Sequence, residues 1–292
     1  MLQTPREPQP GDWFSQPETG INFIYRNGRE GNKFTLMESI GGGVALFDFD
    51  GDGDPDIFLT GGGSIQGSPI TVDGLPNTFY RNEGEFRFTE IGTSAGVAVS
   101  PNYSIGCSVG DFNSDGLPDL FVTGYPHCRL YCNQGDGTFK ELPDSTTVAD
   151  AGLHAASTWG DFDGDGLPDL YVTGYVTFDL REDRNCGEDL RGIRDLCGIW
   201  QYPPAPDRIY RNQGDSTFLE ITTTARLRAD GKGLGAVAAD MNDDGALDLY
   251  VANDFTPNFF YVGDGRGAFQ ERGLQSGIAF DASGVPQGSM GV

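Results

Sequence analysis

Acidic side chains are concentrated in four nine-residue windows of this 292-residue chain. Sixteen of its 31 Asp residues fall within residues 48–56, 111–119, 161–169 and 240–248, whose sequences are DFDGDGDPD, DFNSDGLPD, DFDGDGLPD and DMNDDGALD. Each window places Asp or Asn at positions 1, 3, 5 and 9, and Gly at position 6. Alternate oxygen-bearing side chains around a glycine turn can converge on one cation, and hard oxygen ligands favour Ca²⁺. The windows therefore predict calcium binding at about four sites.

Each window would supply four side chains and the backbone carbonyl of position 7. Four carboxylates within a few ångströms repel one another strongly without a cation, so plain solvated turns are the less favoured interpretation. The windows lack the Glu at position 12 of an EF-hand, and apolar runs of strand length follow them. The predicted side-chain ligands, each set followed by its carbonyl residue, are Asp48, Asp50, Asp52 and Asp56 with Asp54; Asp111, Asn113, Asp115 and Asp119 with Leu117; Asp161, Asp163, Asp165 and Asp169 with Leu167; and Asp240, Asn242, Asp244 and Asp248 with Ala246.

The windows are parts of a longer internal repeat. Small and apolar residues precede each window, and an apolar run such as Leu170-Tyr171-Val172 follows it. A third shared piece, for example IYRNQGDSTF at 209–218, sets Asn, Gly and Asp between two apolar runs, which is typical of a tight hairpin turn. Each unit should therefore form about four short strands. Sheets buried on both faces favour a β-propeller over a solenoid, whose repeats are usually ~20 to 30 residues long, so the predicted class is all-β.

The repeat resembles a known family. The D-x-[DN]-x-D-G-x-x-D loop, the D-[LI]-[FY]-[VL] strand and the [LIF]-Y-R-N-x-G-x-x-x-F hairpin resemble FG-GAP or VCBS-type repeats, over roughly residues 20–292. Such repeats occur in the seven-bladed propeller of integrin α subunits and in the cartilage acidic protein (ASPIC/UnbV-type) family. The segments 20–23 and 42–46, and the insertion that contains Cys186 and Cys197, are also similar to that group. The resemblance implies a propeller with calcium at the positions named above.

The repeats also predict a domain organisation. Residues 1–19 are expected to be a flexible N-terminal segment, and residues 20–292 the propeller repeats, with a Cys-containing insertion at 175–206. If Val292 is matched to Val44, the next Asp would lie four residues beyond Val292. We therefore expect a C-terminally truncated, partial ring of about four to five blades, with the remaining blades missing from this chain. The alternative is a closed four-bladed ring, completed by the segment 23–25.

The cysteines and the other motifs of the sequence do not indicate a reactive site. Five Cys residues leave at least one unpaired. Cys186 and Cys197 lie in a polar insertion where a disulfide could replace a missing core, and they are predicted to pair, whereas the pairing of Cys107, Cys128 and Cys132 stays open. The pentad GCSVG at 106–110 matches a nucleophile elbow but aligns with an inner strand, and the chain has two His residues. The sequence therefore predicts no catalytic site.

Charge and composition restrict the partners. A formal net charge of −24 argues against nucleic acid, which needs clustered Lys and Arg. No apolar run approaches the roughly 18 to 20 residues of a membrane helix, so no membrane insertion is expected. Trp200 and Tyr202 are a candidate recognition surface, although packing over a blade edge is the favoured interpretation.

The predicted function is that of a calcium-binding scaffold for protein or glycan binding and adhesion. A saccharide-active lyase or oxidoreductase on the same propeller is the alternative. Calcium modules outside the cytoplasm bind at about 10⁻⁴ to 10⁻³ M, and disulfides persist in oxidising compartments. We therefore expect an extracellular or cell-envelope location, although no signal peptide is visible at the start of the sequence.

Overall fold

The computed structural model of the chain describes residues 19–98, 102–142, 152–180, 186–187 and 192–289. The expected flexible segment at 1–19, apart from Thr19, and the end of the chain at Val292 lie outside the described residues.

Each repeat folds into one four-stranded antiparallel sheet, as the sequence predicts. The apolar run after each metal window forms the second strand, and the hairpin motif forms the third and fourth strands. The first sheet contains β1 (Val44–Phe47), β2 (Asp56–Leu59), β5 (Thr78–Asn82) and β6 (Phe88–Glu90); the second β7 (Tyr103–Gly110), β8 (Asp119–Tyr125), β9 (Arg129–Asn133) and β10 (Phe139–Glu141); the third β11 (Ser157–Gly160), β12 (Asp169–Val172), β13 (Arg208–Asn212) and β14 (Phe218–Glu220); and the fourth β15 (Gly233–Ala239), β16 (Asp248–Asn253), β17 (Phe259–Gly263) and β18 (Phe269–Glu271).

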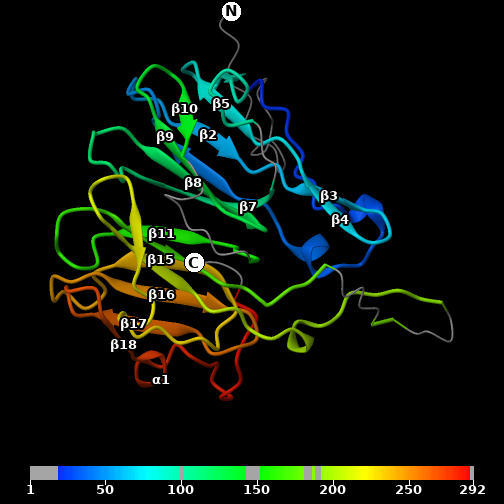
Figure 1. Ribbon diagram of the computed structural model, residues 1–292, viewed down its shortest axis with the longest axis vertical. Helices are drawn as coiled ribbons and strands as arrows, with labels where there is room; N and C mark the ends of the chain where they lie inside the picture. Colours follow the sequence, from blue (N-terminus) through cyan, green and yellow to red (C-terminus); the bar gives the residue numbers. More distant parts are fainter. Residues whose placement is uncertain (1–18, 99–101, 143–151, 181–185, 188–191, 290–292) are drawn as a thin grey trace, which may run out of the picture.

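The sheets pack side by side in chain order, like blades of a propeller (Figure 1). Their first strands contact one another in sequence, β1 with β7, β7 with β11, and β11 with β15. The described residues form no closed ring, so the alternative of a closed four-bladed ring is wrong. The N-terminal segment does not complete the last sheet, because Tyr80 of the first sheet exchanges hydrogen bonds with the backbone of Asn22, at 2.9 and 3.0 Å. The carbonyl of Thr19 likewise accepts the N–H of Phe88, at 2.8 Å.

Aromatic side chains fill the junctions between neighbouring sheets. In the first three windows the residue at position 2 is Phe, and its ring contacts a Phe in the last strand of the next sheet. Burying one such side chain stabilises the fold by roughly 1.5–3 kcal/mol. The pairs are Phe49–Phe139, Phe112–Phe218 and Phe162–Phe269, with ring centroids 6.1, 6.1 and 5.6 Å apart. These contacts explain why an apolar residue interrupts the first three acidic windows.

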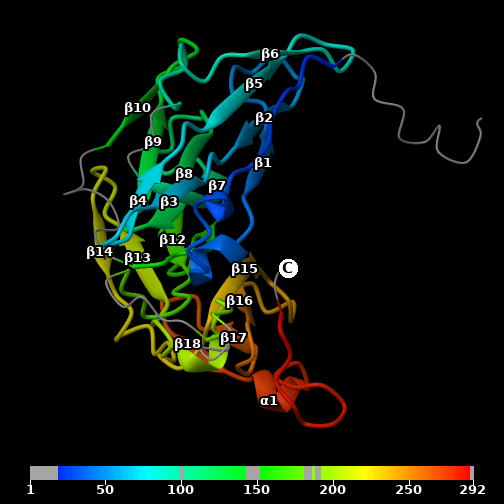
Figure 2. The ribbon, with the colours of Figure 1, turned by 90° about the vertical axis from the view of Figure 1, so that its right-hand side faces the viewer.

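Smaller elements cover one end of the sheets (Figure 2). They are the hairpin β3–β4 (Gly63–Gln66 and Thr71–Gly74) and the 3₁₀ helices η2 (Arg29–Gly31), η3 (Leu36–Ser39) and η6 (Ile199–Gln201). The short helix α1 (Gly273–Ser276) lies elsewhere, against β17 of the fourth sheet. Met37 of η3 is fully buried, and the hydroxyl of Tyr103 donates to its carbonyl at 3.2 Å. No helix among the described residues is long and apolar enough to cross a membrane.

The insertion between β12 and β13 packs on this same end. Cys186 and Cys197 form the disulfide predicted for it, with their Cα atoms 5.0 Å apart. Cys197 and Tyr202 are buried in the core cluster that includes Tyr103, so this part of the insertion packs against the sheets. Trp200, in contrast, is 73% exposed.

Candidate metal centres

The backbone of each window curls around the carboxylate at position 1. In the first window both oxygens of Asp48 accept N–H groups, from Gly51 at 2.8 Å, Asp52 at 3.1 Å and Gly53 at 2.9 Å. Asp111, Asp161 and Asp240 accept equivalent bonds in the other windows. The Gly at position 6 has a φ between 85° and 92° in all four loops, a conformation that favours glycine. This requirement accounts for the repeated Gly.

The carboxylate at position 9 is fully buried at the start of the second strand. Asp169 accepts the N–H of Phe162 at 3.1 Å and the N–H of Asn212 at 2.9 Å, and so joins the window to the third strand. Burial raises the pKa of Asp56 to about 6, and those of Asp119 and Asp169 to about 7. Holding a carboxylate in this position is therefore costly in the absence of a compensating charge.

Two windows bring three carboxylates together. Oxygens of Asp48, Asp50 and Asp56 lie within 4.8 Å of one another, and so do those of Asp161, Asp163 and Asp169. These are positions 1, 3 and 9. The two clusters of acidic residues could hold a metal ion.

The other two windows carry Asn at position 3, so their predicted ligand sets have one carboxylate fewer. The Asn113 amide donates to the Asp115 carboxylate at 2.8 Å, and the Asn242 amide lies 3.5 Å from the Asp248 carboxylate. An Asn side chain still offers one oxygen ligand.

The remaining predicted ligands are not part of the clusters. The carboxylates of Asp52 and Asp165, at position 5, accept the backbone N–H of position 7 at 2.9 Å. Their role as ligands stays a prediction. The same holds for the carboxylates of Asp115 and Asp244 and for the carbonyls of Asp54, Leu117, Leu167 and Ala246.

The donor set of the two clusters fits a hard divalent cation. All the converging atoms are oxygens, and within the described part of the chain no Lys, Arg or His nitrogen lies within 4.0 Å of these carboxylates. The pKa of Asp50 is raised mainly by burial and also by repulsion from Asp52. The pKa of Asp163 is raised in the same way, by burial and by repulsion from Asp165. A bound cation would relieve both effects, because it supplies the missing positive charge.

A second set of contacts ties each window to the next sheet. The side-chain amide of Asn133 donates to the carbonyl of Phe49 at 2.8 Å, and that of Asn212 donates to the carbonyl of Phe112 at 2.6 Å. In the fourth sheet the backbone N–H of Gly267 replaces the amide and donates to the carbonyl of Phe162 at 3.0 Å. Sequence reasoning assigned this Asn to the hairpin turn alone and missed the bond between sheets. The available signal in the sequence was that this Asn recurs shortly before a Gly in the hairpin motifs of the first three repeats.

The sequence profile described as FG-GAP-like repeat matches residues 48–122, 111–172 and 189–251, which is more than half of the chain. The chain belongs to the FG-GAP-like repeat family. The first two matched FG-GAP-like segments begin at Asp48 and Asp111, the first residues of two metal windows, so the resemblance noted in the sequence is confirmed.

Curated relatives of this FG-GAP-like chain include cartilage acidic protein 1. The human protein is 25% identical over 213 residues, which is 66% of this chain and 28% of the human one. The mouse protein is 26% identical over 187 residues, 61% of this chain and 25% of its own length. The chain thus spans about a quarter of the length of these relatives.

Solved structures with some similarity to the FG-GAP-like sheets include a lectin of Agrocybe aegerita that recognises non-reducing terminal N-acetylglucosamine. It is 17% identical with a TM-score of 0.40, and the match covers 77% of this chain and 49% of the lectin. The V. cholerae biofilm matrix protein Bap1 is 16% identical with a TM-score of 0.33, over 79% of this chain and 38% of Bap1.

Proposed function

We propose that this chain is a calcium-binding scaffold of the extracellular space or cell envelope that binds a protein or glycan ligand. The observation that carries the proposal is the convergence of Asp161, Asp163 and Asp169, and of their counterparts in the first window, without a basic partner among the described residues. Three carboxylates of this geometry match the oxygen-only coordination that Ca²⁺ prefers.

The ions would act on the fold rather than on a substrate. Positions 1 and 3 follow the first strand of a sheet and position 9 begins the second strand, so one ion would join the two strands. Four ions would also change the formal net charge from −24 to −16 and reduce self-repulsion. The windows with Asp at position 3 should bind more tightly than those with Asn, because affinity rises with the number of charged ligands.

A binding role is favoured over a catalytic one by several observations. FG-GAP-like repeats and the similarity to cartilage acidic protein 1 are consistent with a scaffold. Exposed aromatic residues on loops of a rigid framework often contact partners, and Trp200, whose ring centroid lies 6.5 Å from that of Phe255, is such a residue. The disulfide between Cys186 and Cys197 supports an oxidising compartment.

A ligand screen in two buffers tests this proposal. The chain would be applied to a glycan array and to biotinylated cell-surface proteins, once with millimolar calcium and once with EDTA. We expect retention of a defined glycan or protein in calcium and its loss in EDTA. Chromatography of the recovered glycans is the control for catalysis, and cleaved or oxidised products would contradict a scaffold role.

A further inference from the structure

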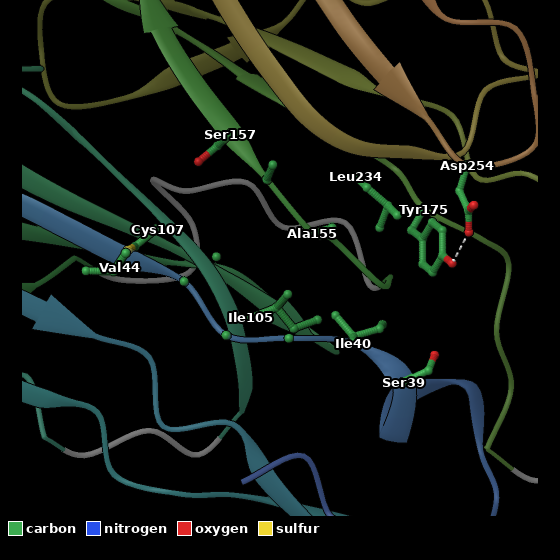
Figure 3. Close-up of a pocket in the computed structure, with 15 residues that line it drawn as sticks. Ser39, Ile40, Val44, Ile105, Cys107, Ala155, Ser157, Tyr175, Leu234 and Asp254 are labelled. Carbon is green, nitrogen blue, oxygen red and sulfur yellow. Dashed lines mark hydrogen bonds between the residues drawn. The ribbon is translucent and has the colours of Figure 1, made fainter. Parts of the chain in front are cut away.

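A cavity of about 430 Å³ opens where the first strands of the sheets begin (Figure 3). Its wall includes the backbone before β1, the middle of β7, the start of β11 and Leu234 in β15. The metal windows follow the other ends of these first strands, so the cavity is separate from the metal centres. Its volume lies in the range of small-ligand sites, roughly 300–1,000 Å³.

One corner of the cavity is polar and acidic. The hydroxyl of Tyr175 donates to Oδ2 of Asp254 at 2.7 Å (Figure 3). Both residues are more than nine-tenths buried, at 4% and 8% exposure. Burial, together with the bond to Asp254, raises the pKa of Tyr175, so its hydroxyl remains a donor at neutral pH. The other oxygen of Asp254, Oδ1, accepts no hydrogen bond from a described residue.

No basic side chain of the described residues pairs with this carboxylate. Lys232 is the basic residue whose charge acts on Asp254, but its ammonium donates to the carbonyl of Ile199 at 2.8 Å and makes no ion pair. A buried carboxylate without an ion-pair partner is electrostatically unfavourable. A positive group placed in the cavity would therefore be attracted to the carboxylate of Asp254, which is part of the lining.

The rest of the lining suits an aliphatic chain better than a sugar. Ile40, Ile105 and Leu234 give the wall an apolar surface (Figure 3). The two serine hydroxyls of the lining are already engaged, Ser39 with the carbonyl of Leu36 at 2.6 Å and Ser157 with the hydroxyl of Ser108 at 2.7 Å. A saccharide would need several free polar partners, whereas an alkylammonium needs one carboxylate and apolar contact.

We propose that this cavity binds an alkylammonium group, with the positive end at Asp254 and the methylene chain against Ile40, Ile105 and Leu234. The group would come from a lysine side chain of a partner protein or from a free diamine. The inference rests on the proposed binding role and specifies its partner chemistry. The net charge of −24 would also raise the local concentration of such cations.

Calorimetry on the calcium-saturated protein tests the proposal with four probes. They are Nα-acetyl-lysine methylamide, cadaverine, the neutral Nα-acetyl-norleucine methylamide and N-acetylglucosamine. We expect the two amines to bind and the norleucine and sugar probes to bind at least tenfold more weakly. A stronger response to the lysine probe would indicate a protein partner, and a stronger response to cadaverine a free amine.

Two variants locate the binding. Asp254→Asn removes the charge and should weaken amine binding at least tenfold. Gly41→Leu should obstruct the cavity, because Gly41 lines it, and a Cβ there would meet no atom within 4 Å, so the first side-chain atom causes no clash. Glu85→Gln, on an exposed side chain, is the control with the same loss of charge and should leave binding unchanged.

Equal affinity for the lysine and norleucine probes would overturn the proposal, as would amine binding that survives both cavity variants. A calcium titration of the same samples separates the two claims. If calcium binds and no amine does, the cavity assignment is wrong and the calcium scaffold stands. If amines bind and calcium does not, the cavity assignment stands and the calcium scaffold is wrong.

Discussion

The side-chain amide of Asn212 in the third sheet donates to the backbone carbonyl of Phe112 in the second sheet, at 2.6 Å. The acceptor belongs to position 2 of a metal window, so the bond joins the loop of one sheet to the hairpin of the next. Both residues are buried, at 2% and 1% exposure. The junction between sheets therefore depends on a polar contact as well as on the Phe112–Phe218 ring pair.

Asn212→Ala should destabilise the protein by about 1–3 kcal/mol, because the buried carbonyl of Phe112 loses its partner. Asn82→Ala is the matched control. Asn82 makes the same bonds within its own sheet, to Pro55 at 3.1 Å and from Gly84 at 3.1 Å, but none to a second sheet among the described residues. Urea unfolding should show the larger loss for the Asn212 variant, and equal losses would contradict a role between sheets.

Asp163 provides a test of the metal ligands. Asp163→Ala should lower the free energy of unfolding in calcium, because it removes a ligand. It should not lower it in EDTA, because the substitution also removes the repulsion between Asp163 and the neighbouring carboxylates. Binding at 100 times Kd is worth about 2.7 kcal/mol, so loss of one site should be measurable. Asp163→Asn is the control, since Asn occupies this position in the second and fourth windows, and it should retain part of the calcium effect. A loss of the same size in EDTA would show that Asp163 acts through packing.

Asp207 should make stability depend on pH. It is buried, accepts the Tyr171 hydroxyl at 2.6 Å and the Gly174 N–H at 2.8 Å, and burial raises its pKa to about 6. A carboxyl with a raised folded-state pKa favours folding while it is protonated, so its contribution is complete below about pH 4 and is lost as the pH rises to about 6. The free energy of unfolding of Asp207→Asn, relative to the wild type, should therefore rise by about 2–3 kcal/mol over this range. Urea titrations in EDTA measure it, and a difference independent of pH would contradict the assignment.

The disulfide between Cys186 and Cys197 should stabilise the insertion against unfolding. Replacing both residues by Ser should cost about 3 kcal/mol, the chain-entropy value for a loop of this length. Thermal unfolding of the variant, and of the wild type with and without a reductant, measures the effect. If the reductant lowers the melting temperature of the double variant as much as that of the wild type, the disulfide is not the cause of the stabilisation.

Much of the fold could be predicted because the repeat is visible in the residues themselves. Four windows with apolar runs on either side specify four sheets, and the turn chemistry of Asn133 and Asn212 specifies the hairpins. The bond from each Asn to the preceding sheet could not be predicted, because it joins residues 84 and 100 positions apart. The acidic cavity was missed for the same reason, since Tyr175 and Asp254 lie 79 positions apart.

The convergence of carboxylates within the windows could be predicted only in part, and the choice of ligands stays a prediction. Alternation suggested that positions 1, 3, 5 and 9 converge, and in two windows positions 1, 3 and 9 do. Position 5 is not part of these clusters, and its carboxylate accepts the N–H of position 7, as Asp165 and Leu167 show.

Isothermal titration of the metal-free chain with calcium tests the central claim most directly. We expect saturable binding at about four sites, with the windows of Asp48 and Asp161 filled first, and a higher melting temperature in millimolar calcium than in EDTA. Zinc added at the same concentration should not replace it, because the windows contain no Cys or His. Absence of calcium binding heat together with identical melting curves in calcium and EDTA would contradict the account.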